Sequence, residues 1–323
     1  MKRIAIVTSG GDAPGMNAAI RAVTRAGVEL GMEIYGVQMG YAGLARGDLV
    51  RLGARDVGGI LALGGTILGT MRLDEFKEPA VQMEAIENLT NRGIEGLVVI
   101  GGNGSQRGAR ALSSLGFPVV GVASTIDNDL YGSDVSIGTD TALNTVIESI
   151  DRIKTTAESH RRVFLVEVMG RKHGYLALVA GIAGGAEVVV TPEREVEPPE
   201  IAAQLRAAHD RGKKYALVVV TDGARNNAER VAKYFREHGE ELGYELRVTI
   251  IGHVQRGGSP TVFDRVLASR LGAAAAELLA GGMGGQLVGW LGGEVAYTPL
   301  DEVATRKKEL DPELWRLSAI LAK

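Results

Sequence analysis

The chain has 323 residues, of which 45% are hydrophobic and 23% charged, a composition typical of a globular protein large enough for two domains. Its formal net charge of -3, without a long basic run, gives no support for nucleic-acid binding, and its lack of cysteine excludes disulfides, thiolate zinc sites and cysteine nucleophiles. No apolar run reaches the length of about 18 residues that a membrane span needs, and no secretion signal opens the chain, so we expect a cytoplasmic protein without a membrane partner.

Apolar runs typical of buried strands alternate with amphipathic segments typical of helices along the whole chain. In the first half we expect strands at 4–8, 33–37, 96–100 and 119–123, and helices near 17–30, 80–92 and 106–115. In the second half we expect strands at 163–169, 188–191, 215–221, 246–252 and 286–291, and helices near 140–159, 174–183, 198–211, 228–238 and 262–279. This alternation predicts right-handed βαβ crossovers and an α/β fold with mostly parallel, doubly wound sheets.

The segment 121–129, GVASTIDND, carries the densest group of reactive side chains. A hydroxyl, Thr125, and two carboxylates, Asp127 and Asp129, follow the expected strand at 119–123. In an open parallel sheet, ligands bind outside the carboxyl ends of the strands. Two acids one residue apart face different ways on an extended backbone, so one can meet an alcohol and the other a cation. The alternative is an ordinary turn, because Asn and Asp favour turns.

Glycine-rich turns follow two other expected strands, at 9–17 and at 101–105. Adjacent glycines let backbone N–H groups point at an anion, and the helix that follows presents its positive N-terminus. Neither turn matches the P-loop or the Rossmann fingerprint. A phosphate site and a plain tight turn therefore both remain open at these positions.

Cationic side chains lie beside further glycines, namely Arg72, Arg171, His253 and Arg256. Each arginine alone is best explained as a solvated surface charge. Several of them at strand ends, in a protein of slightly negative charge, instead indicate anion sites. We therefore expect a phosphorylated substrate as well as a nucleotide.

Taken together, these motifs resemble the phosphofructokinase family over nearly the whole chain. The segments that carry the resemblance, in the family's order and spacing, are TSGGDAPGMNA (8–18), GGNGS (101–105), TIDND (125–129), EVMGR (167–171), IAGGAE (182–187) and GHVQRGGSP (252–260). The resemblance implies a bacterial-type, ATP-dependent 6-phosphofructokinase activity in glycolysis. Such an enzyme transfers the γ-phosphoryl group of Mg-ATP to the 1-hydroxyl of fructose 6-phosphate and gives fructose 1,6-bisphosphate and ADP.

The resemblance also implies an architecture of two Rossmann-like, three-layer lobes with the active site in the cleft between them. Residues 1–138 and 252–301 are expected to form the nucleotide-binding lobe. Residues 139–251 and 302–323 are expected to form the sugar-phosphate-binding lobe. The implied assembly is a homotetramer.

Roles for single residues follow from their positions in the family's motifs. Asp127 is the implied general base, Thr125 lies against the transferring phosphate, and Arg171 stabilises its charge. Asp129 and Asn103 are the implied Mg²⁺ residues. The nucleotide-binding residues are Gly11, Arg72, Gly102, Asn103, Gly104 and Ser105. The sugar phosphate is bound by Thr125, Asp127, Met169, Gly170, Arg171, Asp222, His253 and Arg256, with Arg162 and Arg247 from a neighbouring subunit. The residues of an allosteric site for a nucleoside diphosphate or phosphoenolpyruvate are Arg21, Arg25, Arg55, Lys154, Glu187, Arg211, Lys213 and Lys214.

The chain departs from the family's pattern at three site positions. Asn103 stands where the family has aspartate, Ser124 where it has glycine, and Asp222 where it has glutamate. An amide lacks the negative charge that Mg²⁺ favours in its oxygen ligands, and a side chain at position 124 is expected to crowd the phosphate. The alternative function is therefore a catalytically weak or inactive paralogue that acts as a ligand-binding regulatory or partner subunit.

A pyrophosphate-dependent enzyme is a less favoured alternative. Members of the family that use pyrophosphate carry aspartate at the position of Gly104 and lysine at that of Ser124, and this chain has neither. A side chain at position 104 would occupy the space of the nucleotide α-phosphate. Gly104 therefore favours ATP as the donor.

Overall fold

The computed structural model describes residues 1–160, 162–242 and 245–322. The chain divides into two compact units: unit 1 is 1–141 with 256–308, and unit 2 is 142–255 with the residues from 309 onward. The boundaries fall later in the chain than we expected, at 141 rather than 138, at 255 rather than 251 and at 308 rather than 301. Lys323, which we expected in the second lobe, lies outside the described residues.

Unit 1 contains a seven-stranded sheet. Its strands, in spatial order, are β11 (Glu294–Pro299), β10 (Gln286–Leu291), β5 (Val119–Ala123), β4 (Gly96–Gly101), β1 (Arg3–Thr8), β2 (Glu33–Val37) and β3 (Leu49–Leu52). The five inner strands are parallel, and the edge strands β3 and β11 are antiparallel to their neighbours. The sequence did not predict these two edge strands, because their half-exposed residues do not form a continuous apolar run.

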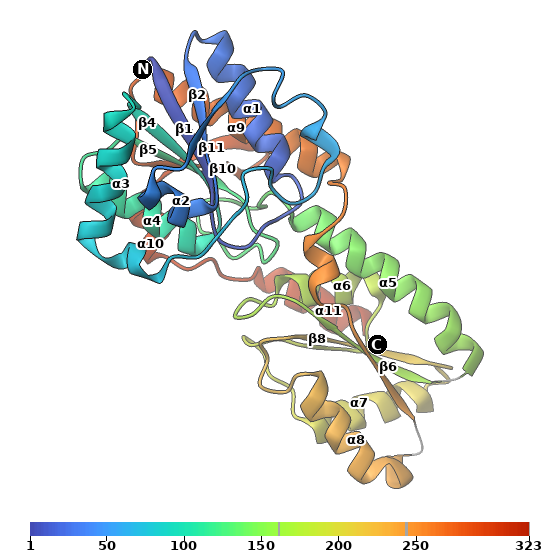
Figure 1. Ribbon diagram of the computed structural model, residues 1–323. Coiled ribbons are helices and arrows are strands. Elements are labelled where there is room, and N and C mark those ends of the chain that lie inside the picture. Colours follow the sequence, from blue (N-terminus) through green and yellow to red (C-terminus); the bar gives the residue numbers. More distant parts are fainter. Residues whose placement is uncertain (161, 243–244, 323) are drawn as a thin grey trace. The chain divides into compact units, whose positions relative to one another are not determined.

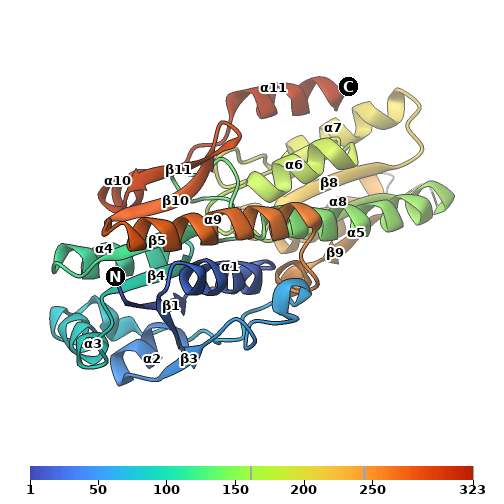
Figure 2. The ribbon, with the colours of Figure 1, turned by 90° about the horizontal axis from the view of Figure 1, so that it is seen from above.

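Helices cover both faces of this sheet. One face packs against α1 (Met16–Glu29) and α9 (Val262–Ala280), which lie side by side in both ribbon views (Figures 1 and 2). A Cβ added at Gly272 of α9 would lie 2.7 Å from the carbonyl oxygen of Ala19 in α1, so glycine permits this close approach. The opposite face is covered by α2 (Gly40–Arg46), α3 (Pro79–Asn91), α4 (Asn103–Ser114) and α10 (Leu300–Thr305). Two 3₁₀ turns, η1 (Ile60–Ala62) and η2 (Asp74–Lys77), complete the unit.

Unit 2 contains a four-stranded parallel sheet. Its strands, in spatial order, are β7 (Val188–Val190), β8 (Ala216–Thr221), β6 (Val163–Val168) and β9 (Leu246–Ile250). One face packs against α7 (Pro198–Asp210) and α8 (Ala228–Leu242). The other face carries α6 (Tyr175–Gly184), α11 (Pro312–Leu321) and most of α5 (Thr139–His160), which begins in unit 1 (Figure 1). A 3₁₀ turn, η3 (Gly252–Arg256), spans the second boundary between the units.

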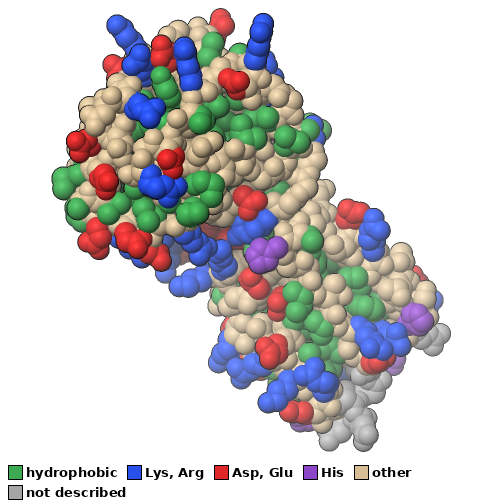
Figure 3. Space-filling model, in the orientation of Figure 1, with side chains coloured by type: hydrophobic (Ala, Val, Ile, Leu, Met, Phe, Trp, Pro, Cys, Tyr) green, Lys and Arg blue, Asp and Glu red, His purple; other side chains and the backbone are tan. Residues whose placement is uncertain are grey.

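Each unit is therefore a three-layer α/β/α structure, and the predicted α/β class with mostly parallel sheets is confirmed. Most of the apolar runs became inner strands, which are buried on both faces, whereas the runs that became β7 and β9 lie at the edges of the unit 2 sheet. Acidic and basic side chains are interspersed on the visible face of both units (Figure 3). In the described part of the chain, no helix has both the length and the apolar composition that crossing a membrane requires.

Candidate active site

Three of the loops that the sequence singled out leave the same edge of the unit 1 sheet. β4 pairs in parallel with both β1 and β5, so the carboxyl ends of these strands lie side by side. The hydroxyl of Ser105 donates a 2.8 Å hydrogen bond to the carbonyl of Ser9. The N–H of Ser124 donates to the carbonyl of Gly101 over 3.3 Å. These bonds join the loop after β1 to the start of α4, and the end of β4 to the loop after β5.

Asn128 shapes the loop that carries the two predicted carboxylates. It adopts a left-handed conformation with φ of 52°, which asparagine tolerates better than most residues. Its side chain donates to the carbonyl of Asp134 and accepts from the N–H of Ser136, both over 3.0 Å. The hydroxyl of Thr125 accepts from the N–H of Asp127 over 3.2 Å. The Asp127 side chain is thereby held in a buried position, with 6% of the residue exposed.

The N-terminus of α4 abuts this loop. The side-chain amide of Asn103 donates a 3.1 Å hydrogen bond to the carbonyl of Asp129. A Cβ added at Gly102 would lie 3.2 Å from the Cβ of Thr125. The positive end of the α4 dipole is therefore next to Thr125, where it favours a bound anion.

The protein supplies only some of the ligands that a metal ion would need at this loop. Within the residues that the structure describes, no group of three or more histidine, cysteine and acidic side chains could hold a metal. The carboxylate of Asp129 and the amide oxygen of Asn103 are two oxygen donors beside one loop. Such a donor set fits Mg²⁺, which keeps several waters and shares its remaining positions with substrate phosphates.

Ser124, whose side chain we expected to crowd the phosphate, is buried. Only 1% of the residue is exposed, and its hydroxyl lies 3.4 Å from the carbonyl of Ile137. Ser124 and Ile137 also form an isolated parallel bridge. The side chain that replaces the family's glycine is therefore accommodated inside unit 1.

The guanidinium of Arg256 lies against the backbone of the loop after β1. Nη1 of Arg256 donates a 2.9 Å hydrogen bond to the carbonyl of Asp12. A Cβ added at Gly11 would lie 2.4 Å from the same nitrogen, so a side chain at this position would displace the guanidinium. The hydroxyl of Thr70 donates over 2.8 Å to the carbonyl of the residue before Gly11. This bond brings the segment that leads to the exposed Arg72 to the same loop.

An aromatic pair beside α4 was not predicted from the sequence. The rings of Tyr41 and Phe76 stack with centroids 4.1 Å apart, and the Tyr41 hydroxyl donates a 2.6 Å hydrogen bond to the carbonyl of Ser105. A Cβ added at Gly108 would lie 2.6 Å from the Tyr41 ring, and burial raises the pKa of Tyr41. Two isolated aromatic residues, one in a short helix and one in a 3₁₀ turn, form no motif that sequence reasoning could have found.

In unit 2, Asp222 supports the backbone of Arg171. The N–H of Arg171 donates a 2.8 Å hydrogen bond to Oδ1 of Asp222, and Arg171 has a left-handed φ of 54°. A Cβ added at Gly223 would lie 1.6 Å from the carbonyl oxygen of Arg171, so this approach requires glycine. The N–H of Met169 donates over 3.3 Å to the side chain of Gln255, which is fully buried. Asp222, predicted to contact the sugar, thus orders the loop that presents Arg171.

Arg162 and Arg247 meet at a residue that the sequence did not single out. Nε of Arg162 lies 3.0 Å from one carboxylate oxygen of Glu245, and Arg247 pairs with the other oxygen. Glu245 therefore balances part of the charge of both predicted sugar-phosphate residues. Of the remaining residues of this set, Gly170 is buried beside Arg171 and His253 is exposed in η3.

Comparison with known proteins identifies the family to which this chain belongs. A family model described as Phosphofructokinase matches residues 3–279. The chain belongs to the phosphofructokinase family. Its relatives include ATP-dependent 6-phosphofructokinase 1 of Thermus thermophilus, 55% identical, and ATP-dependent 6-phosphofructokinase of Shouchella clausii, 51% identical, and in each case 100% of both chains is covered.

Solved phosphofructokinase structures share the fold. The phosphofructokinase of Pichia pastoris in the T-state has a TM-score of 0.88 and is 37% identical, and the match covers 99% of this chain and 36% of that longer chain. A pyrophosphate-dependent phosphofructokinase from Marinobacter aquaeolei has a TM-score of 0.87 at 20% identity, and the match covers 100% of this chain and 91% of that chain. At that identity the second likeness shows the phosphofructokinase fold alone.

The predicted effector residues of this phosphofructokinase-family chain fall into both units. On α1 of unit 1, Arg21 and Arg25 lie one helical turn apart. Nη2 of Arg25 is 3.5 Å from the carbonyl of the residue before Arg55, so the side chain of Arg25 reaches the segment that carries Arg55. In unit 2, Lys154 lies on α5 and Lys214 is exposed before β8.

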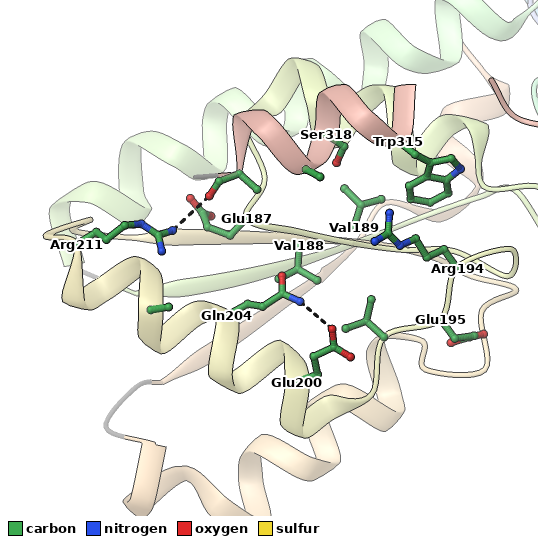
Figure 4. Close-up of a pocket in the computed structure, with 14 residues that line it drawn as sticks. Glu187, Val188, Val189, Arg194, Glu195, Glu200, Gln204, Arg211, Trp315 and Ser318 are labelled. Atoms are coloured by element: carbon green, nitrogen blue, oxygen red, sulfur yellow. Dashed lines mark hydrogen bonds between the residues drawn. The ribbon is translucent and has the colours of Figure 1, made fainter. Parts of the chain in front are cut away.

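A cavity of about 310 Å³ in unit 2 contains two more of the predicted effector residues (Figure 4). It lies between β7, α7 and α11, with Glu187 and Arg211 toward one end and Arg194 and Trp315 toward the other. Nζ of Lys213 lies 2.6 Å from Glu187, so these two predicted residues already form an ion pair. Arg211 donates over 3.4 Å to a main-chain carbonyl at the end of α11.

Proposed function

We propose that this chain phosphorylates the 1-hydroxyl of fructose 6-phosphate with ATP, giving fructose 1,6-bisphosphate and ADP in glycolysis. The observation that carries the proposal is the full-length identity of 51–55% with relatives named as ATP-dependent 6-phosphofructokinases. A regulatory subunit without activity is not favoured, because relatives that match this chain over its full length are named as ATP-dependent 6-phosphofructokinases.

Asp127 is the proposed general base. As the sugar oxygen attacks the γ-phosphorus, the carboxylate accepts the proton of that hydroxyl and ADP leaves. Thr125 lies beside the N-terminus of α4, where a transferring phosphate would be stabilised. The N–H of Gly11 and the guanidinium of Arg171 are proposed to stabilise the charge that develops on this group.

Asp129 and Asn103 are the proposed Mg²⁺ residues. When bound, the ion neutralises phosphate charge of the nucleotide. The carboxylate of Asp129 supplies the one anionic oxygen of this pair. Because the Asn103 amide donates to the Asp129 carbonyl, its nitrogen is occupied and only its oxygen is available for an ion or its waters.

The open space at Gly104 supports ATP as the donor. A Cβ added at Gly104 would meet only the guanidinium of Arg107, at 4.0 Å. The fold therefore has room for a side chain at position 104. We attribute the presence of glycine there to a bound nucleotide that occupies this space. The other proposed nucleotide-binding residues are Gly11, Arg72, Gly102, Asn103 and Ser105, the last through its backbone because its hydroxyl donates to the Ser9 carbonyl.

The remaining proposed sites concern the sugar phosphate, the assembly and the effector. Met169, Gly170, Arg171, Asp222, His253 and Arg256 would bind fructose 6-phosphate, and Arg162 and Arg247 would come from a neighbouring subunit of a homotetramer. Support for the pairing of Arg162 with Arg247 is their shared contact with Glu245. A nucleoside diphosphate or phosphoenolpyruvate would bind at Arg21, Arg25, Arg55, Lys154, Glu187, Arg211, Lys213 and Lys214. A cytoplasmic location remains a prediction from the lack of cysteine.

A coupled assay with ATP, Mg²⁺ and fructose 6-phosphate tests the function. Asp127→Ala is expected to lower kcat by about 10²- to 10⁴-fold, because it removes the proton acceptor. Binding of fructose 6-phosphate, measured by calorimetry, is expected to change little. Asp74→Ala, at an exposed acid of the same unit, is the control and should leave kcat intact.

Two outcomes would contradict the proposal. Ordinary turnover in Asp127→Ala would remove the base assignment. An inert wild type that still binds fructose 6-phosphate would instead favour the regulatory subunit.

A further inference from the structure

A fully buried carboxylate lies in the first turn of α9. Asp264 is 0% exposed. Its Oδ1 accepts a 2.8 Å hydrogen bond from the N–H of Gly138, and its Oδ2 accepts from the N–H and the hydroxyl of Thr141, over 2.8 and 2.5 Å. Burial raises the pKa of Asp264, although the bonds from Thr141 and Gly138 act in the opposite direction. A carboxylate is expensive to bury, so its presence at this position calls for a reason.

The segment that Asp264 binds is itself bonded to the loop of the proposed base. The residues on either side of Gly138 make the contacts: the carbonyl of Ile137 accepts from the N–H of Thr125 over 3.1 Å, and the hydroxyl of Thr139 donates to the carbonyl of Thr125 over 3.0 Å. The Asp264 carboxylate therefore holds Gly138, and the two neighbours of Gly138 make the hydrogen bonds to the main-chain N–H and carbonyl of Thr125. Thr125 in turn accepts from the N–H of Asp127.

Gly138 also contacts the loop after β1. It has a left-handed φ of 101°, and a Cβ added there would lie 2.6 Å from the Cβ of Ala13. The turn at Gly138, which ends the loop after β5, thus lies against the loop after β1. A shift of this turn would move two of the loops proposed to meet the phosphoryl group.

We propose that Asp264 is a positioning residue for phosphoryl transfer: by fixing Gly138 and Thr141, it fixes the loop that carries Thr125 and Asp127. The inference rests on the proposed function. This position requires a carboxylate, because two N–H groups and one hydroxyl donate to its two oxygens. Asparagine would instead turn an NH₂ group, itself a donor, toward one of these donors. A general base must lie within hydrogen-bond reach of the proton that it accepts. A small displacement of Asp127 is therefore expected to lower kcat more than it weakens substrate binding.

Asp264→Asn tests this role against plain destabilisation. We expect kcat per folded enzyme to fall about 10- to 100-fold, while the KM values for ATP and fructose 6-phosphate stay within about threefold. The matched control is Leu271→Ala, a truncation of a fully buried side chain on the same helix. It should lower the melting temperature and leave kcat per folded enzyme unchanged. Equal kcat in Asp264→Asn and wild type would overturn the proposal.

Thr139→Val gives a second measurement if Asp264→Asn folds poorly. The substitution removes only the hydroxyl that donates to the Thr125 carbonyl, and we expect a loss of kcat of the same order. In the double variant the two losses should not add, because both act on one chain of contacts. Full additivity, or an unchanged kcat in Thr139→Val, would contradict the inference.

Hydrogen exchange separates failure of this inference from failure of the proposed function. The amides of 125–138 should exchange faster in Asp264→Asn than in Leu271→Ala, whatever the activity of the enzyme. An inert wild type with this exchange pattern would reject the function alone. An active enzyme whose loop exchanges equally in both variants would reject the positioning role alone.

Discussion

The side-chain amide of Asn103 lies 3.1 Å from the main-chain carbonyl of Asp129 and donates a hydrogen bond to it. A carbonyl oxygen can only accept, so the aspartate that the family has at this position could not make the same contact. Asn103 thus lacks the negative charge of aspartate but adds a hydrogen bond between α4 and the loop of the proposed base. The missing charge is expected to weaken Mg²⁺ binding, whereas the added hydrogen bond is expected to stabilise the fold.

Asn103→Asp is expected to lower the Mg²⁺ concentration for half-maximal activity, because it adds an anionic oxygen beside Asp129. The same change should lose the hydrogen bond, worth about 0.5–1.5 kcal/mol, and recover part of that free energy because a carboxylate at the start of α4 interacts favourably with the helix dipole. Asn103→Ala is the control: it should lose the stability without the gain in Mg²⁺ affinity. Titration of activity with Mg²⁺ and urea unfolding measure the two effects. An Asn103→Ala variant that is as stable as wild type would contradict the role of the amide.

Gly104→Ala should change stability and ATP binding in opposite directions. The added Cβ has room in the protein, and alanine in a helix is worth about 0.5–1 kcal/mol over glycine, so the melting temperature is expected to rise. The KM for ATP should also rise, because the methyl group occupies the proposed phosphate space. Ser114→Ala, at the exposed end of the same helix, controls for helix propensity. An unchanged KM for ATP would remove Gly104 from the nucleotide site.

Glu245→Gln is expected to improve the binding of fructose 6-phosphate. The carboxylate contacts both Arg162 and Arg247, and neutralising it frees their charge for a phosphate. Exposed ion pairs are worth up to about 1 kcal/mol, so the KM for the sugar phosphate should fall about two- to fivefold, and less at high salt. Glu237→Gln, an exposed acid on α8, is the control. A higher KM in Glu245→Gln would mean that the carboxylate helps to place the two arginines.

Lys308 is expected to react with amine-labelling reagents at lower pH than an ordinary lysine. Burial lowers its pKa from 10.5 to about 8, although Asp134 and Asp129 act in the opposite direction. The rate of labelling at Lys308, followed by mass spectrometry, should therefore be half-maximal near the lowered value. Asp134→Asn should shift that midpoint further down. A midpoint close to the ordinary value would show that Lys308 is solvated.

The same lysine gives a dependence of stability on pH. Between about 8 and 10.5 the unfolded chain binds more protons than the folded chain at this residue, so the contribution of Lys308 to the free energy of unfolding rises with pH in that window. Lys308→Met should remove this part of the rise in urea unfolding measured across the window. A rise of the same size in Lys308→Met would assign it to other groups.

The sequence alone predicted the fold class and the place in the sheet where the loops of the proposed active site emerge. Alternating apolar runs and amphipathic segments predict a parallel sheet, and glycine-rich or acidic segments directly after its strands lie at the carboxyl edge. The positions of Asp127, Asp129 and the N-terminus of α4 followed from this rule. The edge strands β3 and β11 did not, because neither forms a continuous apolar run.

Only the tertiary structure decided which side chains support these loops. Asp264 meets Gly138 across more than a hundred residues of sequence, Asp222 meets the backbone of Arg171, and the hydroxyl of Ser124 turns inward. These contacts depend on the distance and direction of single donors and acceptors after folding, and no spacing in the sequence records them. Strand periodicity determines where a loop emerges, whereas hydrogen bonds between distant segments determine how that loop is held.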